Sequence, residues 1–214
     1  MSIKRILGYL VITVMVIGFP AVSYVYLKDG YNFRKALIDS VSDYGEAPSL
    51  AGLTSVQGKL PDSLNGNLVL VSWLTDPQSS SARTLGVTLD SLADQFENSP
   101  HLYLTTISPP GVSEANIHAW RDEFGLPQVG DLLHLLQADS AFIASAVNDY
   151  ALSEVGITEL GQEPIVTLIN AKGHIIKHYD LLQRDETTSL VRYVAAFIPL
   201  PEEEDIILER DNEL

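Results

Sequence analysis

The chain has no cysteine at any of its 214 positions. This absence excludes disulfide bonds, thiol redox chemistry, cysteine nucleophiles and metal sites built from thiolates. It does not identify a compartment, because exported proteins can carry disulfides but do not need them. The chemistry of the protein must therefore rest on other side chains or on binding alone.

Basic residues are also scarce, with 13 Lys and Arg against 28 Asp and Glu and a formal net charge of −15. Every acidic residue follows Tyr26, so the negative charge belongs to the part of the chain after the first 26 residues. Such a domain repels phosphate backbones, which excludes nucleic acid as a partner and makes anionic lipid headgroups poor partners. An acidic surface by itself indicates solubility before it indicates a binding site.

An uncharged run from Ile6 to Leu27 opens the chain. As a helix it would span about 33 Å, enough to cross a bilayer core, so we predict a transmembrane anchor over residues 1–28. Lys4 and Arg5 precede the run, which favours a translocated domain. The alternative is a signal peptide cleaved after Ala21–Ser23, but the apolar run continues beyond that site.

The rest of the chain divides by composition into three parts. We predict a linker over residues 29–52 that contains one short helix, a globular domain over 53–199 and an acidic tail over 200–214. The domain begins with a predicted small hairpin that has Gly58 in its turn.

Within the domain, β-rich segments alternate with amphipathic ones. Predicted strands cover 68–74, 101–108 and 131–137, and a closing antiparallel pair has its turn at 171–173; predicted helices follow Ser79–Ser81, Ser113 and Asp139, and the last covers 185–198. Strands that alternate with helices pair in parallel, and the closing pair adds antiparallel strands. The pattern predicts a three-layer α/β sandwich on a mixed sheet.

The stretch "GQEPIVTLINAKGHI" (161–175) resembles the segment in which thioredoxin-like proteins place a cis proline before a strand, here Pro164. The N-terminal run, "LVLVSWLTDP", "LYLTTISPPGVSEANIHAWRDEFG" and "LLHLLQAD" resemble the SCO/SenC family of cytochrome oxidase assembly proteins. The resemblance implies a thioredoxin-like domain preceded by one transmembrane helix. It also implies a copper chaperone on the oxidising side of a membrane.

The copper ligands of that family are missing from this sequence. Its C-x-x-x-C loop falls on Pro77 and Ser81 in one alignment and on Asp76 and Ser80 in the other, and its histidine falls on Gln162. Hydroxyls and an amide cannot replace the thiolates that select copper(I). We therefore predict no catalytic residue, no cofactor and no metal site.

Other interpretations of the same residues stay open. The loop serines are expected to cap a helix, and no base is assigned that would make one a nucleophile. A metal chaperone with non-thiolate ligands would have to use Asp76, a histidine and the acidic tail, and a hydrolase or peroxidase-like enzyme is a third possibility. His174 and His178 would lie about 13 Å apart along a strand, too far to share one ion.

The missing ligands predict a redox-inactive, membrane-anchored binding or scaffold protein. The resemblance implies that it works in cytochrome oxidase assembly, with oxidase subunits or assembly factors as partners. Its domain would face the periplasm, or the equivalent intermembrane space, from a single-pass inner-membrane anchor. A groove between the "TDPQSSS" loop and Pro164 would hold extended partner segments. The predicted groove residues are Trp73, Thr75, Asp76, Pro77, Ser79, Ser80, Ser81, Gln162 and Pro164, and Trp73 could equally be a core residue.

Overall fold

The computed structural model describes residues 12–58, 64–128, 130 and 132–198. The chain forms two compact units, Met1–Val41 and Ser42–Leu214, which are described separately.

The first unit is helical over its described length. A π-helical turn, η1 (Val14–Gly18), leads directly into α2 (Phe19–Asp39). The wide turn has a local cause, because Pro20 has no N–H for an α-helical bond and the N–H of Phe19 bonds to the carbonyl of Val14 instead. None of the described helices combines the length and the hydropathy of a membrane span, and the predicted run begins at Ile6, outside the described residues.

The short helix expected within the predicted linker, 29–52, is present as the last part of α2, whereas the end of the linker next to the domain is not a free connection. The helix does not stop after the apolar run but continues to Asp39, so residues 29–39 are helical. Residues 42–47 then pair with the edge of the sheet in the second unit. Only Ser40 and Val41 separate these two ordered segments.

The second unit is built on a six-stranded mixed sheet with the order β1-β4-β3-β2-β5-β6. Its strands are β1 (Thr54–Gln57), β2 (Leu68–Trp73), β3 (Leu102–Ser108), β4 (Leu133–Gln137), β5 (Ile165–Ile169) and β6 (Ile175–Asp180). Strands β2, β3 and β4 are parallel, and β1, β5 and β6 join them in antiparallel pairs. All six residues of β2 are buried, as its continuous apolar sequence predicts for a central strand.

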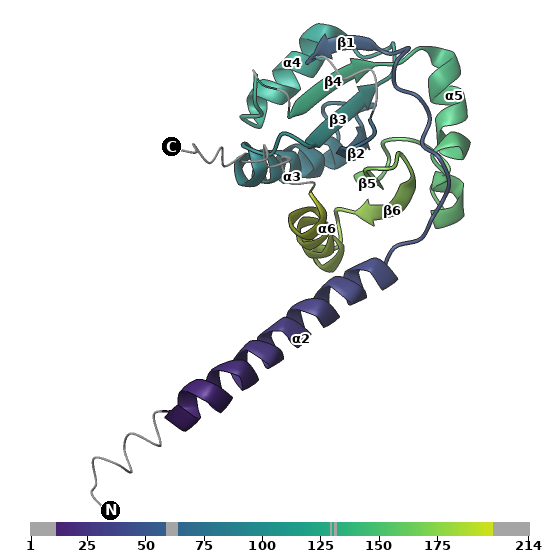
Figure 1. Ribbon diagram of the computed structural model, residues 1–214. Helices are drawn as coiled ribbons and strands as arrows, with labels where there is room; N and C mark the ends of the chain where they lie inside the picture. The colour runs from purple at the N-terminus through teal and green to yellow at the C-terminus, as the bar shows by residue number, and fades with distance from the viewer. Residues whose placement is uncertain (1–11, 59–63, 129, 131, 199–214) are drawn as a thin grey trace, which may run out of the picture. The chain divides into compact units, whose positions relative to one another are not determined.

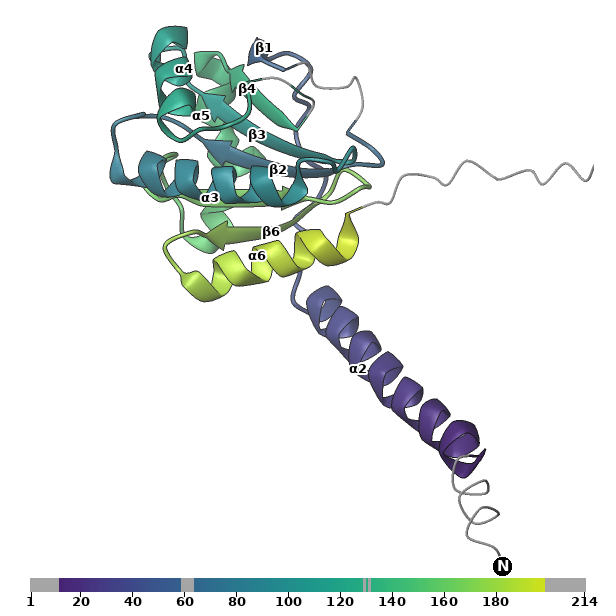
Figure 2. The same cartoon turned by 90° about the vertical axis from the view of Figure 1, so that its left-hand side faces the viewer.

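Helices cover both faces of the sheet. They are α3 (Ser80–Phe96), α4 (Glu114–Glu123), α5 (Ser140–Asp149) and α6 (Arg184–Phe197), with a short 3₁₀ turn, η2 (Leu152–Val155). Figures 1 and 2 show α3, α4 and α6 on one face and α5 on the other. This follows from connection handedness, since two successive right-handed crossovers place α3 and α4 together and the return from β4 to β5 places α5 opposite.

The predicted helix caps are confirmed. Ser79, Ser113 and Asp139 each accept a bond from a backbone N–H in the first turn of α3, α4 and α5 respectively. The predicted hairpin around Gly58 is wrong for Thr54–Gln57, which pairs with β4 at the edge of the sheet. Residues 59–63 of that hairpin, like the tail 200–214, lie outside the described residues.

Candidate functional site

The loop between β2 and α3 occupies the position that holds the reactive thiols in the resembling families, and its polar groups are bonded locally. Asp76 Oδ1 accepts from the N–H of Gln78 at 2.9 Å, which forms an Asx turn. The Ser79 hydroxyl donates to the Asp76 carbonyl at 2.8 Å and accepts from the N–H of Ala82 at 3.0 Å. These contacts build a turn and cap a helix, and the Ser79 proton goes to a backbone carbonyl rather than to a base.

A second loop, residues 161–164, lies directly against this turn. The Ser81 hydroxyl donates to the Gln162 carbonyl. Gly161 has φ +76°, and a Cβ at this position would lie 1.9 Å from Thr75 Oγ1. The two loops therefore contact one another through Thr75 and Ser81, so these residues help to close the predicted groove at this point.

Pro164 differs from the family pattern. The described part of the chain has no cis peptide bond, so the cis geometry implied by the resemblance is wrong here. The Pro164 ring is buried, and its carbonyl accepts from the N–H of Leu181 at 3.1 Å. The Glu163 carbonyl accepts from the N–H of Ile165 at 2.9 Å, so this segment already uses backbone acceptors that an extended partner would need.

Trp73 belongs to the core. Its side chain is 6% exposed and meets Tyr150 edge to face, with ring centroids 5.1 Å apart. Trp73 Nε1 and the Tyr150 hydroxyl have no hydrogen-bond partner among the described residues. Burial raises the pKa of Tyr150, which keeps this phenol neutral. The pair is an apolar support under the loops rather than an edge of the groove.

The remaining predicted residues form a polar rim at the carboxyl end of β2. Asp76, Ser80 and Gln162 are exposed. Thr75, Pro77, Ser79 and Ser81 are half-buried. The structure thus brings seven of the nine predicted residues to this rim and places Trp73 and Pro164 beneath it.

One exposed apolar residue next to the Pro164 segment is not among the predicted groove residues. Leu182 is 65% exposed in the turn between β6 and α6, next to Leu181, whose N–H bonds to Pro164. The sequence signal was the apolar pair Leu181-Leu182 before the last helix, of which only the first is buried. Leu182 thus exposes an apolar side chain one residue from the backbone contact with Pro164.

No group of three or more His, Asp or Glu that could hold a metal ion occurs among the described residues. The histidines have other contacts: His118 with Arg121, His174 with Asp43, His178 with Thr167, and His101 with Asn67. His134 packs against Tyr103. The non-thiolate metal chaperone therefore gains no support here, and the acidic tail that it would use lies outside the described residues.

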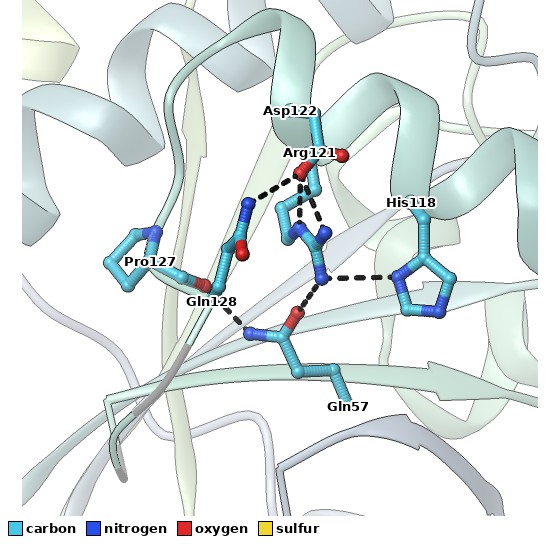
Figure 3. A network of polar contacts seen from close by, with 6 residues as sticks. All are labelled: Gln57, His118, Arg121, Asp122, Pro127 and Gln128. Atoms are coloured by element: carbon cyan, nitrogen blue, oxygen red, sulfur yellow. Dashed lines mark hydrogen bonds and ion pairs between the residues drawn. The ribbon is translucent and has the colours of Figure 1, made fainter.

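A polar network lies away from the rim, between α4 and the edge strand β1 (Figure 3). The Arg121 side chain is 12% exposed and donates from Nη1 to Gln57 Oε1 at 2.7 Å. It also contacts His118 Nδ1 at 3.1 Å and forms an ion pair with Asp122 at 2.6 Å. Gln57 in turn donates to the Pro127 carbonyl at 2.7 Å. This network ties β1 to α4 and to the loop after α4.

A cleft of about 510 Å³ lies at the opposite end of the sheet from the rim. Its lining comes from the loop between α3 and β3, Glu97–Pro100, and from Pro127, Gly130 and Leu132. It contains none of the predicted groove residues.

No protein-family model and no curated protein matches the sequence. Solved structures do match its shape. BsSco, a member of the Sco family of cytochrome c oxidase assembly proteins, has a TM-score of 0.56 at 14% identity and covers 76% of this chain and 98% of its own. A SCO1/SenC family lipoprotein from Bacillus anthracis has a TM-score of 0.53 at 12% identity, with 73% and 97% covered.

The thioredoxin domain of a thiol-disulfide oxidoreductase from Bacteroides vulgatus has a TM-score of 0.50 at 15% identity, with 74% and 99% covered. These likenesses show the fold. The chain has a thioredoxin-like α/β fold, and the solved structures that share this fold include Sco-family proteins and thiol oxidoreductases.

Proposed function

We propose that this chain is a membrane-anchored, redox-inactive thioredoxin-like protein that works by binding other proteins during cytochrome oxidase assembly. The β2–α3 loop is the observation that supports the redox-inactive part of this proposal. Its Ser79 and Ser81 hydroxyls donate to backbone carbonyls, in a chain that has no cysteine. A loop bonded in this way positions a surface and supplies no nucleophile, so the protein is not an enzyme of this fold's usual kind.

The anchor is supported by the N-terminal helix. Its large apolar side chains are exposed from Ile12 to Leu27, and in water such a surface would be unfavourable. The uncharged run continues in sequence back to Ile6, which gives the length that a bilayer requires. Lys4 and Arg5 before the run favour a domain on the outer side, facing a periplasm or an intermembrane space.

The setting in oxidase assembly is supported by the shape of two Sco-family neighbours. The rim around the β2–α3 loop is the proposed binding surface, with oxidase subunits or assembly factors as partners. Because backbone carbonyls under the rim are bonded internally, we expect partners to contact side chains such as Leu182 more than the backbone.

The test is affinity purification of the full-length protein from native membranes, with partners identified by mass spectrometry. Two matched pairs of variants locate the surface. Leu182→Asp changes an exposed aliphatic residue at the rim, and Val87→Asp changes one that is 56% exposed on α3. Ser80→Tyr adds a ring at the first residue of α3, beside the rim, and Ser91→Tyr adds the same ring in the second half of the helix.

We expect oxidase subunits or their assembly factors in the wild-type sample, and at least tenfold less of them with Leu182→Asp and Ser80→Tyr only. Equal recovery with all four variants would exclude the rim as the binding surface. Recovery of unrelated proteins alone would refute the proposed role in oxidase assembly, and the fold would be the sole likeness to the Sco-family proteins.

A further inference from the structure

A short extended segment, Ser42–Ala47, lies along the free edge of β6, and we call it the strap. It exchanges backbone bonds with β6 and the turn before it: Ser42 N–H to Ile176 O at 2.9 Å, Tyr44 N–H to Ile175 O at 2.9 Å, Ile175 N–H to Gly45 O at 2.9 Å and Ala47 N–H to Gly173 O at 2.8 Å. The strap therefore occupies an edge that would otherwise be open to another strand.

Side chains hold the strap in the same place. Asp43 forms an ion pair with His174 at 3.0 Å. A bond from the N–H of Gly45, followed by the contact with His174, lowers the pKa of Asp43 and keeps it charged. The Tyr44 ring lies 4.9 Å from the His178 ring and packs against the core, and Leu50, just beyond the strap, is 5% exposed.

We propose that the strap moors the domain to its anchoring helix through a joint of two residues, Ser40 and Val41, so that the domain acts only on partners in or on the same membrane. This inference rests on the proposed anchor. The alternative arrangement is a long flexible connection that would let the domain reach distant soluble partners.

The difference in reach is large. A free linker over residues 29–52 could extend about 80 Å from the membrane at 3.3–3.6 Å per residue. In the structure α2 continues after Leu27 to Asp39, and this helical extension adds about 18 Å at 1.5 Å per residue. The joint adds about 7 Å more. Ser42, where the domain begins, is then held within about 25 Å of the surface, so partners in the same membrane have a high effective concentration near the domain.

The first experiment measures hydrogen exchange of the strap amides in the full-length protein. The N–H groups of Ser42, Tyr44 and Ala47 donate into β6, whereas no bond from Asp43 or Glu46 N–H occurs within the described structure. We expect at least tenfold slower exchange at the first three positions than at the last two. Uniformly fast exchange across the strap would show that the strap is not held on β6. This outcome would overturn the proposal whether or not the protein is anchored in a membrane.

The second experiment measures the distance of the domain from the membrane. The chain has no cysteine, so Ser91→Cys on α3 gives a single dye position without further changes. Energy transfer from this dye to acceptor lipids is compared between the parent and two variants in liposomes. One inserts twelve Gly and Ser residues between Ser40 and Val41, and the other, Tyr44→Pro, removes a strap N–H and the ring that covers His178.

We expect lower and more widely distributed transfer in both variants than in the parent. The insertion leaves the strap and domain unchanged, so it keeps the test valid if Tyr44→Pro does not fold. Equal transfer in the parent and the insertion variant would show that the joint does not limit reach. A parent protein that fails to float with liposomes would refute the anchor. The exchange pattern would still test whether the strap is bonded to β6.

Discussion

At the scale of single residues, Gly161 is the position where backbone and packing are both restricted. Its φ of +76° disfavours any side chain, and a Cβ would collide with Thr75. Gly156 offers a matched control because its φ is +86° and nothing lies within 4 Å of a Cβ there. The pair separates backbone strain from collision between the two loops.

We predict that Gly161→Ala lowers the free energy of unfolding by about 2–4 kcal/mol, the sum of strain and overpacking. Gly156→Ala should cost only about 1 kcal/mol, from strain alone. Urea unfolding of the full chain measures both. Thr75→Ala should recover part of the loss at Gly161, and equal losses for the two glycines would contradict the close contact.

His178 supplies a prediction about pH. Burial lowers the pKa of His178 to about 4, because the residue is only 8% exposed and desolvation disfavours its charged form. Its usual pKa in an unfolded chain is about 6.5. Between these values the unfolded chain binds a proton that the folded chain does not, so stability falls as the pH decreases from about 6.5 to 4.

The loss assigned to His178 should approach about 3 kcal/mol at pH 4, at 1.36 kcal/mol per pH unit. Unfolding free energies of the wild type and of His178→Leu are measured across this range, and the difference between the two curves isolates the histidine. A difference that does not change with pH would show that His178 is accessible to protons in the folded protein.

At the scale of elements, the edge strand β1 is short and half-exposed, so its position depends on contacts outside the ladder. The Arg121 side chain provides such a contact through Gln57, and it is mostly buried. Arg83 has an ion pair too, at 3.5 Å to Glu123, but its side chain is 74% exposed. Comparing the two arginines therefore tests whether a mostly buried ion pair stabilises the fold more than an exposed one.

We predict that Arg121→Met lowers the unfolding free energy by about 1–3 kcal/mol, because Gln57 loses a charge-assisted bond and Asp122 loses its cation. It should also speed hydrogen exchange in β1. Arg83→Met should change stability by less than about 0.5 kcal/mol. Similar effects at the two positions would mean that the network in Figure 3 does not hold β1.

The elements also show what the sequence could and could not predict. Helix caps such as Ser79 and the buried strand β2 were predicted because their signals are local in the chain. The pairing of β1 with β4 and of the strap with β6 was missed because it joins segments far apart in sequence. The rim was predicted from loop position, but the burial of Trp73 and the exposure of Leu182 depend on packing that no local pattern reports.

At the scale of the whole molecule, the chain joins two regions with opposite solvent preferences. The described part of the first helix exposes large apolar side chains, whereas the domain follows with nearly all of the negative charge. With the proposed anchor, the apolar region would lie in a bilayer and the acidic region in water.

The anchor is tested by one charge placed inside the apolar run and one placed outside it. Val16→Arg puts a cation near the middle of the run Ile6–Leu27, at a cost of about 2.5–3.5 kcal/mol for insertion, so we predict a large loss of the protein from the membrane fraction. Tyr31→Arg lies beyond Lys28 on the same helix and should leave the distribution unchanged. Carbonate extraction and flotation of the expressed full-length protein measure both. N-terminal sequencing of the membrane-bound wild type completes the test, because a mature protein that begins after Ser23 would establish cleavage and remove the anchor from which the short reach of the domain follows.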